Sequence, residues 1–244
     1  MTLGFAEGEY QDGELRGLSL IAGKRGMGKT TEMARLLSQC GGGVVFFDSL
    51  SKHDSILTGY KIITQPGDLA AYLRVNRGRR FRVLYQPRAG DQAAHFRSVC
   101  VIVRAIGWMI FGIDEIDMQC GPRWGDSRMP PEFYHLVNYG RHERVSLLAT
   151  ARTPMSVARG FTAACLSMRI FQTTEESHIR YFEAYVGEEN ARALRSLEKY
   201  KYLHWRDGEA TTIGGGSHPG GPEAGSKAVE TSYKDLSNPE KESI

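Results

Sequence analysis

Residues 18–30 read LSLIAGKRGMGKT, a short apolar run that passes directly into a glycine-rich loop. The last part of this stretch, Gly23 to Thr30, fits the pattern G-x-x-x-x-G-K-[ST]. Glycines let backbone N–H groups wrap around phosphate oxygens, and the start of the following helix adds a favourable dipole. The stretch therefore predicts a phosphate-binding loop between a buried strand and an amphipathic helix.

The pattern also assigns roles to individual side chains of the loop. Lys29 is expected to reach the β- and γ-phosphates of ATP, and the Thr30 hydroxyl is expected to bind Mg²⁺. The predicted nucleotide contacts are Gly23, Lys24, Arg25, Gly26, Met27, Gly28, Lys29, Thr30 and Thr31. A glycine-rich turn without a ligand is the alternative, but the strand before the loop and the helix after it favour a nucleotide site.

A second signal is the run WMIFGIDE at residues 108–115, an apolar strand that ends in two carboxylates. Asp114 is expected to hold the water shell of Mg²⁺, and Glu115 to polarise the attacking water. An acidic pair at a strand end is common by chance. Its position downstream of a phosphate-binding loop makes it informative.

A third apolar strand, VSLLAT at residues 145–150, ends in a threonine. In a parallel sheet this end lies at the same edge as the nucleotide. Thr150 is therefore a candidate contact for the γ-phosphate or the lytic water. A threonine that only caps the next turn is the alternative.

Strands and helices alternate along most of the chain, which predicts an α/β fold with a mainly parallel, fully buried sheet. We expect an N-terminal extension at residues 1–14, one P-loop ATPase domain at 15–206, and a disordered Gly/Pro/Ser-rich tail at 207–244. The expected strands are 18–22, 44–47, 80–85, 108–113, 145–150, 166–172 and 200–205. The expected helices are 30–39, 66–75, 93–105, 131–141, one from 155, and those within 175–197.

Charge is divided unevenly between these regions. The chain has 31 Lys+Arg and 28 Asp+Glu, of which the tail holds 3 and 7, so the body carries +7 and the tail −4. A basic body rich in arginine suits a polyanionic partner. The four cysteines are widely spaced and the seven histidines show no metal spacing, so we expect no zinc site and only structural or surface histidines. No signal peptide or transmembrane segment is indicated, which predicts a cytoplasmic protein.

Taken in order, the strings GKRGMGKT, IFGIDE, YGRH, LLATARTP, RIFQTTE and YVGEE resemble the FtsK/HerA superfamily of DNA-pumping ATPases. The resemblance covers roughly residues 15–206 and is closest to genome-packaging ATPases of membrane-containing phages, with Zot-like assembly ATPases next. The strand at 80–85, which separates the loop from the acidic pair, and Glu115 resemble the additional-strand, catalytic-glutamate class of P-loop ATPases.

This resemblance implies a homo-oligomeric ring of about five or six subunits that pumps double-stranded DNA. It also implies capsid or packaging-vertex partners, in the host cytoplasm or at the virion vertex. The chain is too short for the extra domains of cellular HerA and FtsK, and it lacks the membrane segment expected of a Zot-like protein. The alternatives are a Zot-like assembly ATPase and, from another class, a non-translocating ATP-dependent switch.

The remaining candidate functional residues, for catalysis between subunits and for DNA binding, are mostly arginines. Arg141 and Arg152 are candidate fingers that act on a neighbouring subunit's nucleotide. The alternative for each is a surface arginine that pairs with a nearby acid such as Glu143. The family's TQRP string is altered here, with Ala151 in place of glutamine and Thr153 inserted before Pro154. The loop at residues 119–129 is a candidate DNA-gripping loop, with a solvated basic turn as the alternative. Its candidate DNA contacts are Arg123, Trp124 and Arg128.

Overall fold

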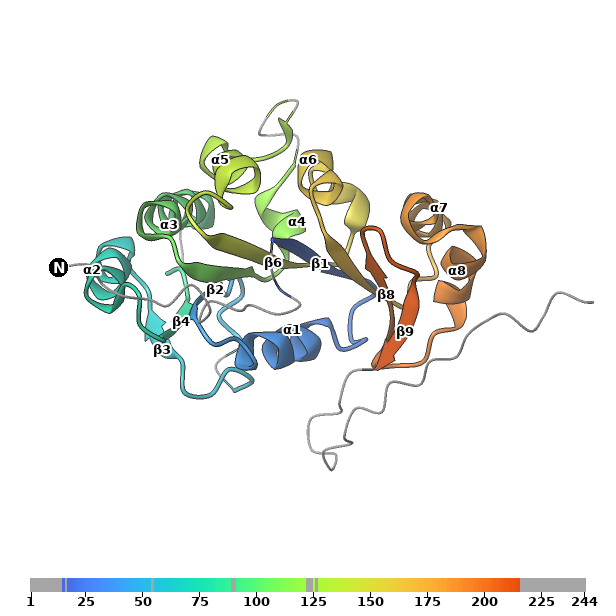
Figure 1. Cartoon of the computed structure of the whole chain (residues 1–244), viewed down its shortest axis with the longest axis horizontal. Coiled ribbons are helices and arrows are strands. Elements are labelled where there is room, and N and C mark those ends of the chain that lie inside the picture. The colour runs from blue at the N-terminus through green and yellow to red at the C-terminus, as the bar shows by residue number, and fades with distance from the viewer. Residues whose placement is uncertain are drawn as a thin grey trace, which may run out of the picture.

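The computed structural model describes residue 15 and residues 17–53, 55–88, 91–121, 125 and 127–215. Within these ranges the chain forms one sheet of nine strands in the order β3-β4-β2-β5-β6-β1-β7-β8-β9 (Figure 1). Neighbours from β3 to β7 are parallel, whereas β8 and β9 are antiparallel to theirs. The strands are β1 Leu18–Ala22, β2 Gly43–Phe47, β3 Lys61–Ile63, β4 Arg82–Tyr85, β5 Met109–Ile113, β6 Val145–Ala151, β7 Ser167–Phe171, β8 Lys201–Arg206 and β9 Thr212–Gly215. The predicted mainly parallel α/β sheet is confirmed.

Helices cover both faces of this sheet. The α-helices are α1 Lys29–Ser38, α2 Pro66–Asn76, α3 Gln92–Ile106, α4 Ile116–Gln119, α5 Pro131–Tyr139, α6 Arg159–Ala163, α7 Glu176–Val186 and α8 Glu188–Ala193. Figure 1 shows α1 on one face and α3, α5 and α6 on the other. No helix in the described ranges is long and apolar enough to cross a membrane.

Two hydrophobic clusters hold the sheet between these helices. Strands β2, β5, β6 and β7 are buried along their whole length, as parallel strands covered on both faces must be. In β5, Ile110 belongs to the smaller cluster beside α1, and Phe111 belongs to the larger one with Phe96 and Phe133. Each such side chain stabilises the fold by about 1.5–3 kcal/mol. This double-sided packing fixes the end of β5, where the acidic pair begins.

The strand inserted between the phosphate loop and the acidic pair is β6. It pairs with β1 on one side and with β5 on the other, so that Thr150 lies beside Ile21 and Ala149 beside Ile113. The additional-strand arrangement predicted from the sequence is confirmed. The strand predicted at residues 80–85 is present as β4, and it pairs with β2 and β3 further along the sheet.

Three short elements were not predicted. Strand β3 has three residues of which only Ile63 is buried, so its sequence shows no alternation of apolar and polar residues that would predict a strand. Helix α4 is a single turn after the acidic pair. The third element, β9, pairs with β8, and Gly214 is so close to the Tyr202 ring that a Cβ would lie 2.3 Å from it. Regular structure therefore extends past the predicted boundary at Asp207, whereas residues 1–14 and 216–244 lie outside the described part.

Candidate active site

The glycine-rich loop is attached to the carboxyl ends of the central strands. The Gly23 N–H donates to the carbonyl of Ala151 in β6 at 3.3 Å, and the Lys24 N–H donates to the carbonyl of Gln172 after β7 at 2.9 Å. Helix α1 begins at Lys29, and no side chain caps its N-terminus. Its first N–H groups therefore point toward the place where the loop would receive a phosphate.

Two of the glycines are required by crowding as well as by backbone conformation. Gly23 has φ 138° and Gly28 has φ 107°. A Cβ on Gly28 would lie 2.5 Å from Cδ1 of Tyr200, and one on Gly23 would lie 2.7 Å from Cβ of Phe171. The Tyr200 N–H also donates to the Met27 carbonyl at 3.1 Å. Phe171 and Tyr200, which are distant in sequence, thus pack against the glycine-rich loop.

The other predicted nucleotide contacts follow the course of the loop. Lys24, Arg25 and Gly26 are exposed at its tip, while Thr30 and Thr31 are half-buried in the first turn of α1. Met27 packs into the smaller hydrophobic cluster. Its side chain is therefore part of the hydrophobic core.

Lys29 is the buried cation of the site. It is 7% exposed, and its Nζ donates to the Lys24 carbonyl at 3.0 Å. Burial lowers the pKa of Lys29 to about 8, against the opposing charges of Asp114, Asp117 and Glu115. A polyanion at the loop would stabilise the charged form of this side chain. The group is suited to holding phosphate oxygens.

Asp114 is buried at the end of β5, and neighbours hold both of its carboxylate oxygens. Oδ1 accepts a hydrogen bond from Thr150 Oγ1 at 2.7 Å, and Oδ2 lies 3.5 Å from His53 Nε2. Burial raises the pKa of Asp114, although His53 and Thr150 oppose the rise. The carboxylate is thus fixed in one orientation beside the glycine-rich loop.

Glu115 turns away from the strand in a left-handed conformation with φ 50°. Its N–H donates to Thr150 Oγ1 at 2.9 Å, and its Oε2 lies 2.7 Å from Nη2 of Arg152. Burial and the neighbouring Asp114 raise the pKa of Glu115, while Arg152 lowers it. A raised pKa suits a carboxylate that accepts a proton from water.

Thr150 connects the two acidic residues. It is 1% exposed, and its hydroxyl proton is directed at Asp114 while its oxygen accepts from the Glu115 N–H. The structure thereby gives Thr150 a part in holding the acidic pair. The predicted contact with a γ-phosphate or lytic water stays a prediction.

The two candidate arginine fingers occupy opposite ends of β6. Arg152 follows the strand and pairs with Glu115 of its own chain. Arg141 is exposed in the turn before the strand, at the sheet edge opposite the phosphate loop. The alternative partner Glu143 lies instead beside Arg104, at 3.6 Å. Arg141 therefore lies at the opposite end of β6 from the glycine-rich loop of its own chain.

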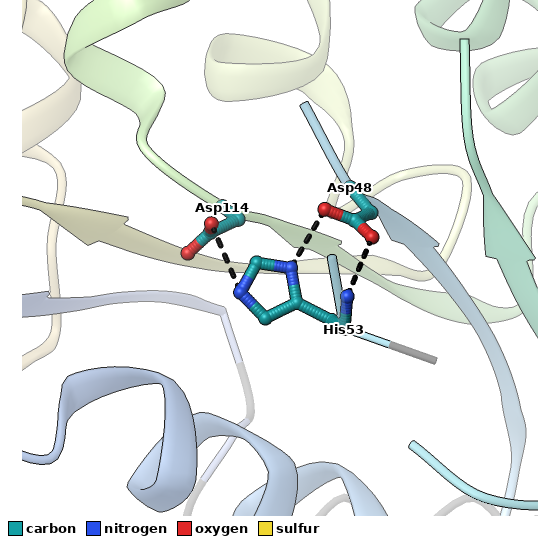
Figure 2. A group of neighbouring side chains, drawn as sticks. All are labelled: Asp48, His53 and Asp114. Atoms are coloured by element: carbon teal, nitrogen blue, oxygen red, sulfur yellow. Dashed lines mark hydrogen bonds and ion pairs between the residues drawn. The ribbon is translucent and has the colours of Figure 1, made fainter. Parts of the chain in front are cut away.

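The structure adds two residues that the sequence reasoning missed. Asp48 follows β2 and His53 lies in the next loop, and both are buried beside Asp114 (Figure 2). Ligand atoms of these three residues lie within 4.8 Å of one another. The acidic end of a buried strand was a readable signal for Asp48. Nothing in its polar loop marked His53, so its predicted structural or surface role missed the contact with Asp114.

These contacts determine the charges of Asp48 and His53. Burial by itself would raise the pKa of Asp48, but hydrogen bonds from the side chain and backbone of His53 outweigh it, so the pKa is lowered. Burial would likewise lower the pKa of His53, yet Asp48 and Asp114 raise it. The pair is therefore stabilised as a carboxylate with an imidazolium.

Of the candidate DNA contacts, only Arg128 lies in the described part of the chain. It is exposed, has φ 52°, and its carbonyl accepts from the Gly121 N–H at 2.9 Å. This places it in the connection from α4 to α5, which leaves the sheet just after the acidic pair. Arg123 and Trp124 lie outside the described residues.

Comparison with known proteins bears on the fold of this chain. No protein-family model matches the chain, and no curated protein is similar to it in sequence. Among solved structures, the genome-packaging NTPase B204 from Sulfolobus turreted icosahedral virus 2, in complex with AMPPCP, aligns with a TM-score of 0.65 at 14% identity. The alignment covers 81% of this chain and 96% of B204. This chain shares the fold of that NTPase.

Two further solved structures share this fold. B204 from Sulfolobus turreted icosahedral virus, described as a DNA-packaging ATPase, has a TM-score of 0.63 at 15% identity, with 83% of this chain and 98% of that one covered. VirB4 of Thermoanaerobacter pseudethanolicus has a TM-score of 0.59 at 11% identity, with 82% and 89% covered. The resemblance to viral packaging ATPases is thus confirmed at the level of fold. At these identities, activity has to be argued from the site.

Proposed function

We propose that this chain hydrolyses ATP and uses the energy to move DNA, as a packaging ATPase that pumps double-stranded DNA into a viral capsid. The observation that carries the proposal is the convergence of Lys29, Asp114 and Glu115 at one sheet edge, where their charges act on one another. Such a cation beside two carboxylates, at the mouth of a glycine-rich loop, suits phosphoryl transfer to water.

Each group of the site has a part in this reaction. Backbone N–H groups of the loop and Lys29 hold the phosphates. Thr30 and Asp114 would hold Mg²⁺, and their oxygen donors match its preference. The bound ion would neutralise charge that develops on the phosphates. Glu115 accepts the proton of the attacking water, which requires that Arg152 release its carboxylate.

The position of Arg141 supports a ring. An exposed arginine at the far edge of the sheet can stabilise the reaction only in a neighbouring subunit. Head-to-tail contacts that bring this edge to the next phosphate loop close into a ring when the rotation permits. In this proposal Arg141 is the finger in trans, and Arg152 acts within its own subunit.

DNA would lie against the loop that follows the acidic pair. Arg128 is exposed there, and the chain carries Arg123 and Trp124 a few residues earlier. Arginines bind phosphate oxygens without reading sequence, as a motor that passes over a whole genome requires. Such a motor would work in the host cytoplasm or at the virion vertex, where capsid proteins are its partners.

The test is steady-state ATPase activity as a function of DNA. Turnover should rise with added double-stranded DNA and disappear in Lys29→Ala and Glu115→Gln. Robust turnover that DNA does not change would overturn the translocase. Stronger stimulation by single-stranded DNA would indicate a Zot-like assembly ATPase. Persistent monomers with ATP and DNA, and no loss of activity in Arg141→Ala, would indicate a non-translocating switch.

A further inference from the structure

We propose that His53, held by Asp48, is a positioning residue that orients the Asp114 carboxylate for the metal–nucleotide complex. The proposal rests on the ATPase function proposed above and adds two residues to its site. The juxtaposition is drawn in Figure 2, where the imidazole ring lies between the two carboxylates.

Asp48 anchors the ring through a full set of hydrogen bonds. Its Oδ1 lies 2.6 Å from His53 Nδ1. Its Oδ2 accepts from the N–H groups of Lys52 and His53 at 2.8 and 3.0 Å, and from Gln86 Nε2 at 3.1 Å. A buried carboxylate with this many donors has one orientation available, so it fixes both the ring plane and the protonated Nδ1.

The opposite nitrogen of the ring then faces Asp114. Nε2 lies 3.5 Å from Oδ2, and both side chains are almost completely buried. Because Thr150 holds the other oxygen of Asp114, the carboxylate is constrained from two sides. Outer residues that orient a metal-binding carboxylate in this manner commonly account for a ten- to hundredfold change in metal affinity.

The loop that carries His53 is itself fixed to the acidic strand. Ser49 Oγ donates to the Asp114 carbonyl at 3.0 Å, and Gln92 Nε2 donates to the Ser49 carbonyl at 2.7 Å. Hydrogen bonds therefore connect the ends of four neighbouring strands. Gln86 after β4 bonds to Asp48 after β2, and Asp114 after β5 bonds to Thr150 in β6. This continuity holds the ring at a fixed place beside Asp114 rather than leaving it free to swing out.

The deciding experiment measures metal binding directly. We would titrate Mn²⁺, a spectroscopic substitute for Mg²⁺, into the full-length protein with a non-hydrolysable ATP analogue and follow it by electron paramagnetic resonance. His53→Ala should weaken Mn²⁺ affinity ten- to hundredfold, while metal-free nucleotide affinity stays unchanged. His53→Gln, whose amide can still donate to Asp114, should recover part of the affinity. His95→Gln is the matched control, because His95 bonds to Tyr85 instead and should behave as wild type.

A double-mutant cycle with Asp114→Asn tests whether His53 acts through Asp114. The two changes should be strongly non-additive, so that His53→Ala adds little once Asp114 is replaced. Wild-type Mn²⁺ affinity in a folded His53→Ala or Asp48→Asn variant, or additivity in the cycle, would overturn the proposal. So would stoichiometric Zn²⁺ binding by the three side chains without nucleotide. If wild-type protein binds Mn²⁺ and nucleotide but shows no DNA-stimulated turnover, the proposed function fails while this result stands.

Discussion

Arg152 Nη2 lies 2.7 Å from the carboxylate of Glu115 in the same chain. The guanidinium is the larger and more exposed of the two groups, with its side chain 38% exposed against 13% for that of Glu115. Under the proposed function, a contact from DNA or from a neighbouring subunit would draw it away. The residue predicted to accept a proton from water is thus restrained by a partner that can move.

Removal of this restraint should raise activity in the absence of DNA. A pair exposed to this extent is worth at most about 1 kcal/mol, so Arg152→Ala should increase DNA-free turnover by no more than about fivefold. Stimulation by DNA should fall correspondingly. Arg159→Ala, which removes an exposed arginine of α6, is the control. Turnover as low as that of Glu115→Gln would instead make Arg152 a catalytic group.

Replacement of Thr150 by valine should damage both stability and turnover. Valine has nearly the same shape but leaves Asp114 Oδ1 and the Glu115 N–H without their partner. We expect a loss of about 1–3 kcal/mol in the free energy of unfolding, measured with urea, and a lower kcat. Thr150→Ser keeps the hydroxyl and should stay near wild type. A loss in Thr150→Ser as large as that in Thr150→Val would contradict this reasoning, because serine keeps the hydroxyl that makes both hydrogen bonds.

Lys29 should destabilise the nucleotide-free protein. Its pKa falls from 10.5 to about 8 in the folded state, so at pH 7 the folded protein bears a penalty of up to roughly 3 kcal/mol. Between pH 8 and 10.5 the unfolded chain keeps a proton that the folded chain loses. Stability contributed by this group therefore rises with pH over that interval.

Lys29→Met tests this directly. The variant should lose nucleotide binding, yet exceed the wild type in unfolding free energy at pH 7. The difference should shrink as the pH approaches 10.5. Urea denaturation at a series of pH values measures it, and a variant less stable than wild type at pH 7 contradicts the reasoning.

Substitution of the loop glycines should have unequal costs. Gly26→Ala meets no atom within 4 Å and should cost about 1–2 kcal/mol, from its positive φ alone. Gly28→Ala adds a Cβ at 2.5 Å from the Tyr200 ring and should cost more and weaken ATP binding. Tyr200→Ala combined with Gly28→Ala should recover the difference. Equal melting temperatures for the two single variants would argue against the close packing of Tyr200.

The sequence by itself determined the parts of the site that are local in the chain. The loop from Gly23 to Thr30 needs glycines at fixed spacing because backbone N–H groups must surround a phosphate. The acidic pair needs a buried strand before it because the strand delivers both residues to one sheet edge. Motifs formed by a few adjacent residues can be predicted from the sequence without knowledge of the tertiary structure.

Only the tertiary structure decided which residues from distant segments surround those motifs. Strand order made β6 the neighbour of both motifs, and so placed Thr150 against Asp114. The same packing brought His53 to the site from a polar loop with no recognisable pattern, and Tyr200 from the start of the strand predicted at residues 200–205. Such contacts depend on how crossovers arrange parallel strands, because burial and hydrogen bonding between distant segments leave no periodic trace in either segment alone.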